Sequence, residues 1–208
     1  MRAGRPALLA LVVLWLASPL ALAFKAGGDF AKPAAAGGGG AILFTGAPTY
    51  RRWTCAACHT GSAGRVRLRL ESQPPELLTN RRYRPGATYA LTVSLEGEHR
   101  GLDSALNTNG FAVTMATAAG EAAGRFTGVD GTELVAGNTD AELVSSGLYE
   151  RRTTWTFMWE APVSGRGAVT AYLAVVDGDG ASRKDLRTSD PFNDDLAVGS
   201  IRLEEVAP

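Results

Sequence analysis

Short stretches in which apolar and polar residues alternate recur between residues 66 and 203. Neighbouring side chains of an extended strand point to opposite faces, so this period of two predicts strands that each bury one face. Gly, Asp, Asn and Pro separate the stretches, as is typical of turns. The apolar positions are Val66, Leu68 and Leu70; Tyr89, Leu91, Val93 and Leu95; Phe111, Val113 and Met115; Trp155, Phe157 and Trp159; Val169 to Val176; and Ile201 and Leu203.

About seven strands of this kind, with no amphipathic helix of three turns between them, favour two sheets packed face to face. The sequence therefore predicts an all-β fold, an immunoglobulin-like antiparallel β-sandwich over residues 65–208. A short haem-attachment segment at residues 43–64 is expected to precede it. Residues 24–42 are dominated by Gly and Ala and are predicted to be a flexible spacer.

The N-terminus has the features of a cleaved signal peptide, predicted to span residues 1–23. Arg2 and Arg5 precede a short apolar run at residues 7–16, and the small-residue site Ala21-Leu22-Ala23 follows. An uncleaved signal anchor is the alternative, which the shortness of the apolar run disfavours. We expect an exported protein, periplasmic or extracellular, with no membrane span after cleavage.

The most specific chemical motif is the CxxCH stretch from Cys55 to His59, which contains both Cys residues of the chain. Two thiols with two residues between them can each form a thioether with one vinyl group of a haem, and the next imidazole can ligate the iron. The export signal agrees, because c-type haem is attached outside the bacterial cytoplasm. The motif predicts one covalent haem c bound by Cys55, Cys58 and His59.

Three other interpretations of the motif stay open. A thioredoxin-type disulfide between Cys55 and Cys58 would be expected in a βαβ setting, which the sequence does not predict. Zinc would need four ligands, and Cys55, Cys58, His59 and His99 are just enough, although binding one ion through the adjacent Cys58 and His59 would strain the backbone. Two unpaired structural thiols are disfavoured in an oxidising compartment.

The second axial position of the iron has few candidate ligands. Met115, Met158 and His99 are available, and a weaker ligand or an open position is the alternative. Met115 ranks first as a ligand, although the pattern of its strand makes a core residue the commoner role. The metal ligands predicted are therefore His59 and Met115.

Two weaker patterns lie near the predicted strands. Asp177 and Asp179 offer oxygen ligands for calcium, but the segment lacks the spacing and the bidentate Glu of an EF-hand, so a hairpin turn is favoured. Arginines on both sides of the motif could meet haem propionates or an acidic partner, or could form one solvated strand face. These are Arg51, Arg52, Arg65, Arg67 and Arg69.

Several segments carry a family resemblance: Phe44 to Pro48, Thr54 to Gly61, Tyr83 to Tyr89, Asn109 to Val113, Trp159 to Pro162 and Val169 to Tyr172. Together they resemble exported bacterial proteins described as choice-of-anchor V or Reeler-like domains. The resemblance implies an immunoglobulin-like β-sandwich with a cytochrome-like CxxCH motif just ahead of it. It implies no known reaction, because a fold does not specify a function.

The function that these features favour is electron transfer by an exported monohaem c-type cytochrome-like protein that serves a redox partner protein and is not itself an enzyme. The alternative is a surface or periplasmic binding or adhesion module in which CxxCH is structural. A haem enzyme ranks third, because His99 is the one histidine left for a distal site. Lys plus Arg equals Asp plus Glu at 21 each, so charge gives no reason to expect nucleic acid as a partner.

Overall fold

The structure is a computed structural model that describes residues 27–36, 38–57, 59, 65–97, 109–129, 131–135, 139–145, 152–163, 165–178 and 194–207. The predicted signal peptide, Cys58, His99 and Asp179 lie outside these described residues. Within them, no helix is long and apolar enough to cross a membrane.

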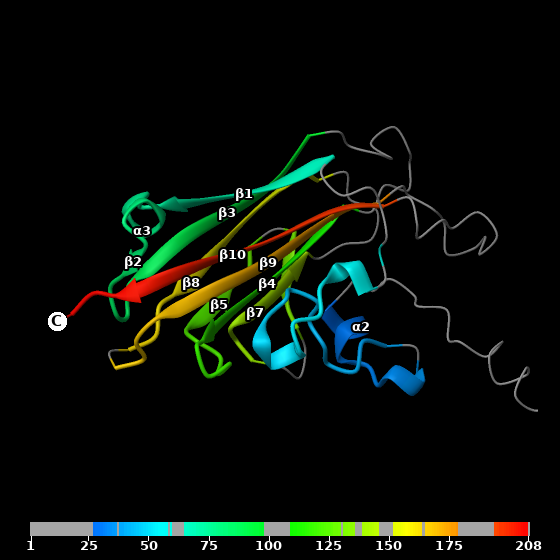
Figure 1. Ribbon diagram of the computed structural model, residues 1–208, viewed down its shortest axis with the longest axis horizontal. Coiled ribbons are helices and arrows are strands. Elements are labelled where there is room, and N and C mark those ends of the chain that lie inside the picture. Colours follow the sequence, from blue (N-terminus) through cyan, green and yellow to red (C-terminus); the bar gives the residue numbers. More distant parts are fainter. Residues whose placement is uncertain are drawn as a thin grey trace, which may run out of the picture.

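The described strands form two sheets that pack face to face, which confirms the predicted all-β sandwich (Figure 1). The four-stranded sheet has the order β1 (Val66–Gln73), β3 (Thr88–Gly97), β8 (Thr154–Glu160) and β5 (Arg125–Thr127). The six-stranded sheet has the order β2 (Arg82–Tyr83), β10 (Asp195–Glu205), β9 (Val169–Asp177), β4 (Gly110–Thr117), β7 (Glu142–Ser145) and β6 (Thr132–Leu134).

Strand pairing is antiparallel except between β2 and β10, which differs from the wholly antiparallel sandwich that the sequence predicts. The short helix α3 (Glu76–Thr79) turns the chain after β1 and brings β2 beside the end of β10. Glu204 N–H donates to the Arg81 carbonyl at 2.8 Å and Val206 N–H to the Tyr83 carbonyl at 2.9 Å. These bonds are the slanted ladder of a parallel pair.

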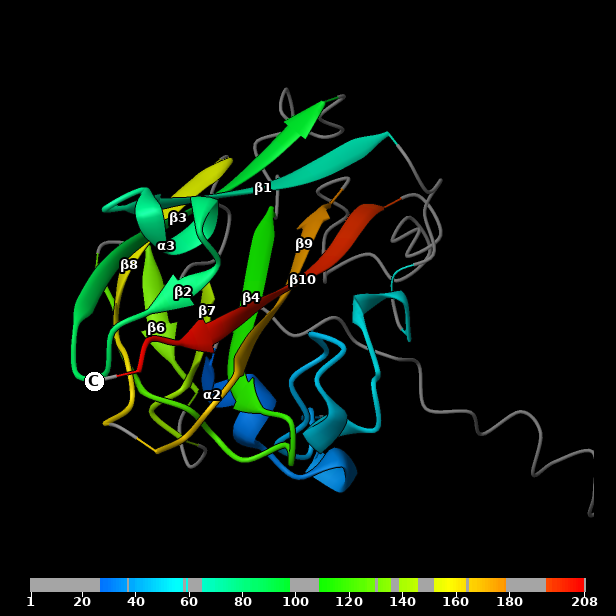
Figure 2. The ribbon, with the colours of Figure 1, turned by 60° about the vertical axis from the view of Figure 1, so that its left-hand side comes forward.

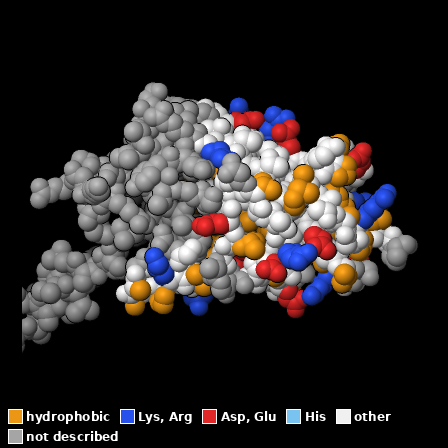
Figure 3. All heavy atoms as spheres, turned by 180° about the vertical axis from the view of Figure 1, so that it is seen from behind, with side chains coloured by type: hydrophobic (Ala, Val, Ile, Leu, Met, Phe, Trp, Pro, Cys, Tyr) orange, Lys and Arg blue, Asp and Glu red, His pale blue; other side chains and the backbone are white. Residues whose placement is uncertain are grey.

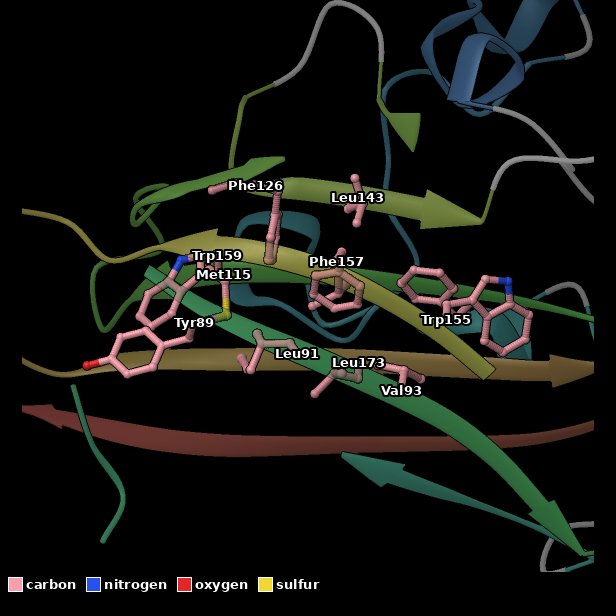
Figure 4. Close-up of a cluster of buried hydrophobic side chains, with 14 of the residues drawn as sticks. Tyr89, Leu91, Val93, Met115, Phe126, Leu143, Trp155, Phe157, Trp159 and Leu173 are labelled. Atoms are coloured by element: carbon pink, nitrogen blue, oxygen red, sulfur yellow. The ribbon is translucent and has the colours of Figure 1, made fainter. Parts of the chain in front are cut away.

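The core lies between the sheets and is built from the alternating apolar positions of the sequence. Trp155, Phe157 and Trp159 of β8 are at most 1% exposed, and they face side chains of the six-stranded sheet (Figure 4). Phe111 of β4 stacks on Phe157, with ring centroids 5.5 Å apart. Aromatic burial of this extent supplies much of the favourable free energy of folding.

Residues 27–36 and 38–42, which the sequence predicts to belong to a flexible spacer, include a helix that contacts the six-stranded sheet. The helix α2 (Gly27–Ala31) contacts β7, and a 3-10 turn follows at Ala34–Ala36. Phe30 packs with Leu43 and Val144 in a second, smaller apolar cluster. Figure 2 shows this segment on the side of the six-stranded sheet that faces away from β1 and β3. The aromatic ring of Phe30 and the buried Leu43 account for the packing, because they need apolar cover.

The outer surface carries charges of both signs. On the face shown in Figure 3, Lys and Arg side chains alternate with Asp and Glu side chains among small apolar areas, over the residues that are coloured there. Charges of both signs also lie close together on β1 and β3, where Arg69 is 2.8 Å from Glu71 and 3.4 Å from Glu96. This face therefore does not present a field of one sign to a partner.

Candidate functional site

The described residues of the CxxCH motif, which are Cys55 to Ala57 and His59, include a tight helical turn. The 3-10 helix η3 (Cys55–Ala57) begins directly after Thr54, which forms an isolated antiparallel bridge with Thr45. The His59 N–H donates to the Cys55 carbonyl at 2.9 Å, which closes a five-residue turn around the motif. This bond has the i to i−4 spacing of an α-helix. The motif is thus a compact unit in which the backbone of His59 is tied to that of Cys55.

The motif is fastened to the outer face of the six-stranded sheet. Thr45 and Thr114 of β4 share a hydrogen bond of 2.9 Å between their hydroxyls, and both side chains are buried. The Tyr50 hydroxyl donates to Oε1 of Glu142 on β7. The helix η3 itself contacts β9 and β10. The described residues of the predicted attachment segment therefore pack against the outer face of the sandwich.

His59 contacts a carboxylate from the far end of the chain. Its Nδ1 lies 2.5 Å from Oδ2 of Asp194, and the two side chains are 16% and 11% exposed. A carboxylate next to Nδ1 favours the proton on that nitrogen. The lone pair of Nε2 is then the one that can bind a metal. The arrangement can therefore present an oriented, electron-rich imidazole.

The next residue, Asp195, lies on the other face of β10. It pairs with Asp177 across β9 and β10, and both residues are 0% exposed. Asp177 is the last residue of β9 and pairs with the first residue of the antiparallel β10, so the segment that follows it connects two neighbouring strands. Asp179 lies outside the described residues. In the described part of the chain, no group of three His, Cys, Asp or Glu side chains is arranged to hold a metal ion.

The outer face of β9 and β10, the two strands that η3 contacts, carries apolar side chains. Leu196 pairs with Val176 and Val198 pairs with Ala174, so these side chains share that face. Val198 is 48% exposed, and Leu196 and Val176 are half-buried. A large apolar residue that is so exposed often marks a binding surface when it adjoins others.

A second aromatic contact lies within the attachment segment. The rings of Phe44 and Trp53 stack with centroids 6.2 Å apart, and Trp53 is 47% exposed. The Gly46 N–H donates to the Trp53 carbonyl at 2.8 Å, which holds the two arms of the segment together. Trp53 thereby presents an exposed aromatic face next to Cys55.

The structure does not bring Met115 near His59. Met115 is 0% exposed and pairs with Ala171, and Figure 4 shows its sulfur among the core side chains. Asp177, which pairs with Asp195, is six residues farther along β9, or about 20 Å at the rise of a strand. In this arrangement Met115 is a core residue, and its prediction as an iron ligand is not supported by proximity.

Met158 is not beside His59 either. Met158 is half-buried on the outer face of the four-stranded sheet, where it pairs with Ala90. His99 lies outside the described residues. Of the two interpretations of the arginines, β1 favours a solvated strand face, because Arg67 and Arg69 are exposed while Val66 is buried. Arg51 and Arg52 are exposed in left-handed turn conformations with φ of 54° and 61°.

Two of the three side chains that the haem prediction names, Cys55 and His59, lie in the described part of the chain. Cys55 is 9% exposed on a helical turn, the Nδ1 of His59 is hydrogen-bonded, and the turn contacts β9 and β10. These are the chemical types that a covalently bound porphyrin with one imidazole ligand needs. The sequence marked Cys55 and His59 as site residues. The sequence pattern gives no signal for Asp194, since nothing in it pairs this residue with His59.

Comparisons with known proteins concern the fold. No family model and no curated protein matches the chain. The Reelin-N domain of F-spondin is similar with a TM-score of 0.49 and 20% identity, covering 74% of this chain and 96% of that chain. The human F-spondin reeler domain gives 0.48 and 20%, covering 72% and 96%. AggA, the major subunit of aggregative adherence fimbriae type I from Escherichia coli, gives 0.36 and 10%, covering 71% and 100%.

Proposed function

We propose that the chain is an exported β-sandwich protein that carries one haem c, bound through Cys55 and Cys58 and ligated by His59, and that it transfers electrons. The observation that carries the proposal is the hydrogen bond of 2.5 Å between His59 Nδ1 and Asp194 Oδ2. A histidine that follows two Cys residues on a turn, with its second ring nitrogen already held by a carboxylate, has the arrangement of a metal-ligating imidazole.

The surroundings of the motif support a porphyrin on the outer face of β9 and β10. A porphyrin exposes a large apolar face, and its burial against protein is favourable. Leu196 and Val198 lie two and four residues after Asp194, which corresponds to about 7 and 13 Å along a strand. These side chains would cover one face of the cofactor beyond His59.

The position of the start of β10 in the six-stranded sheet supports a role in electron transfer. Residues 195–203 of β10 pair with β9, while β2 pairs only with Glu204 and Glu205. Among the strands that the structure describes, a cofactor next to the start of β10 would therefore lie at an edge of the six-stranded sheet. A haem held there by Cys55, Cys58 and His59 would supply a one-electron couple between a donor protein and an acceptor protein.

A second candidate is a binding or adhesion module in which the CxxCH turn is structural. The observation that favours it is the tight packing of the motif segment, since Leu43 and Ala47 are 0% exposed and Thr45 is 2% exposed. A segment anchored in this way stabilises the sandwich whether or not it carries a cofactor. The exposed loops would then provide the binding surface.

Expression with a c-type maturation system and a haem stain on a denaturing gel tests the proposal. We expect the wild-type protein to stain, because thioether bonds survive denaturation, and its intact mass to include one haem. Cys55→Ala/Cys58→Ala should not stain. The matched control is Ala56→Ser/Ala57→Ser, which changes the two exposed residues between the cysteines. We expect it to stain like the wild type.

The outcomes separate the candidate functions. A stained protein with a low-spin spectrum and reversible reduction supports electron transfer. A stained protein with a high-spin, open iron contradicts the electron-transfer role in favour of an enzyme. A wild-type protein that never stains contradicts the haem proposal and leaves the binding module.

A further inference from the structure

His59 and Asp194 form a contact that the choice of haem ligands by itself does not require. The two residues are separated by 135 positions in the sequence, and Nδ1 lies 2.5 Å from Oδ2. Both side chains are largely buried, at 16% and 11% exposed. A buried carboxylate is unfavourable unless a donor compensates for its lost water, and the imidazole N–H is such a donor.

The position of Asp194 follows from the start of β10. Asp195 is fully buried and pairs with Asp177, whereas the Asp194 side chain reaches His59 beside the outer face. Consecutive residues of an extended chain point to opposite sides, so one acidic residue faces each side at this point. Because β10 is held by nine paired residues of β9, the backbone that carries Asp194 is well anchored.

We infer that Asp194 is a positioning residue for His59, which holds the ring by Nδ1, directs Nε2 to the iron and lowers the reduction potential of the bound haem. The inference rests on the proposed function. A hydrogen bond to a carboxylate increases the electron density that an imidazole gives to a metal. Ferric iron has one more positive charge than ferrous iron, so it gains more from this donation and from the nearby negative charge.

The test is the midpoint potential of the haem-loaded protein, measured by optical redox titration at one pH. Asp194→Asn keeps the size of the side chain and removes its negative charge, and we expect a more positive potential. Asp194→Glu restores the carboxylate and should return the potential toward the wild-type value. The matched control is Asp140→Asn, which removes one negative charge from an exposed residue next to β7, and we expect it to leave the potential unchanged.

These results distinguish positioning from a purely structural role. If Asp194 only stabilises the fold, Asp194→Asn will unfold more easily while its potential equals that of the wild type, and that result overturns the inference. An equal shift in Asp140→Asn also overturns it, because the effect would then be one of overall charge. A wild-type protein that never acquires haem contradicts the proposed function instead.

A second measurement does not depend on the stability of Asp194→Asn or on the redox titration. Nitrogen NMR of the His59 ring in the full chain without haem reports which nitrogen carries the proton. We expect the neutral ring to be protonated at Nδ1, in agreement with donation to Asp194. A neutral ring protonated at Nε2 would mean that Nδ1 does not donate to Asp194, and the inference would fall.

Discussion

Thr45 and Thr114 share a hydrogen bond of 2.9 Å between hydroxyls that come from the motif segment and from β4. The two residues are 2% and 3% exposed. This hydrogen bond connects the segment that contains Cys55 to the sheet. Because both hydroxyls are excluded from water, removing one of them leaves the other buried without this partner, which lowers the stability of the fold.

Replacing one hydroxyl of this pair should destabilise the protein. We expect Thr114→Val to lower the free energy of unfolding by about 1–3 kcal/mol, because it leaves the Thr45 hydroxyl buried without this partner. Denaturant unfolding measures the change. The double variant Thr45→Val/Thr114→Val should recover part of the loss. The exposed pair Thr92 and Thr156, also 2.9 Å apart, is the control, and a similar loss in Thr92→Val would contradict the role of burial.

Gly124 should tolerate a side chain less well than Gly165. Both have positive φ, at 81° and 86°, so Ala strains the backbone at either position. A Cβ at Gly124 would lie 2.4 Å from the Glu160 carbonyl and 2.5 Å from Trp159 Nε1, whereas Gly165 has nothing within 4 Å. We expect Gly124→Ala to cost about 1–3 kcal/mol more than Gly165→Ala. Thermal or denaturant unfolding of the two variants measures the difference. Equal losses of stability would show that the close contact of the added Cβ at Gly124 does not determine the cost.

Tyr83 should make the folded state less stable at high pH. Burial, followed by the negative charge of Glu205, raises the pKa of Tyr83 to about 12 from its usual value of 10.0. Between these two values the unfolded chain loses the phenolic proton while the folded chain keeps it. The unfolded state then binds fewer protons, so the free energy of unfolding falls as the pH rises from about 10 to 12.

Denaturant unfolding at several pH values and the tyrosinate absorbance check this prediction. Tyr83 donates to the Gly167 carbonyl at 2.7 Å, and its hydroxyl is 3.3 Å from Glu205. Tyr83→Phe removes the titrating group, so its stability should depend less on pH in this range. An equally steep loss in both proteins would assign the effect to another group.

The position of the proposed haem can be tested by NMR of the matured protein. If the porphyrin lies over the outer face of β9 and β10, the ferric form should shift or broaden the resonances of Leu196 and Val198 relative to the ferrous form. Phe126 of β5, in the other sheet and buried on its inner side, should change little. Unaltered resonances at Val198 in a haem-loaded sample would place the cofactor elsewhere.

The longer strands could be predicted from the sequence because alternation over five or more residues is hard to mistake. The patterns around Leu91 and Phe157 correspond to β3 and β8, with the apolar residues buried. The strands β2, β5, β6 and β7 have two to four residues each, which is too short for a period of two to show. They form because neighbouring strands offer hydrogen bonds.

The segment before the sandwich shows the limit of composition as a guide. Its Gly and Ala residues indicated a flexible spacer, but Phe30 and Leu43 find apolar partners on β7 and nearby residues. Whether such a segment packs depends on the surface that the folded sheet presents to it. That surface includes Val144 and Ala112, which are almost 70 to more than 100 residues away in the sequence.

By itself, the sequence determined the β class of the fold, the core faces of the main strands and the CxxCH motif, because these depend on residues close together in the chain. Only the tertiary structure decided that Asp194 holds His59, that Met115 belongs to the core, and that the motif is fastened to the outer face of the six-stranded sheet. Each of these depends on strand pairing and on the face to which a residue points, and both are settled by contacts between distant parts of the chain.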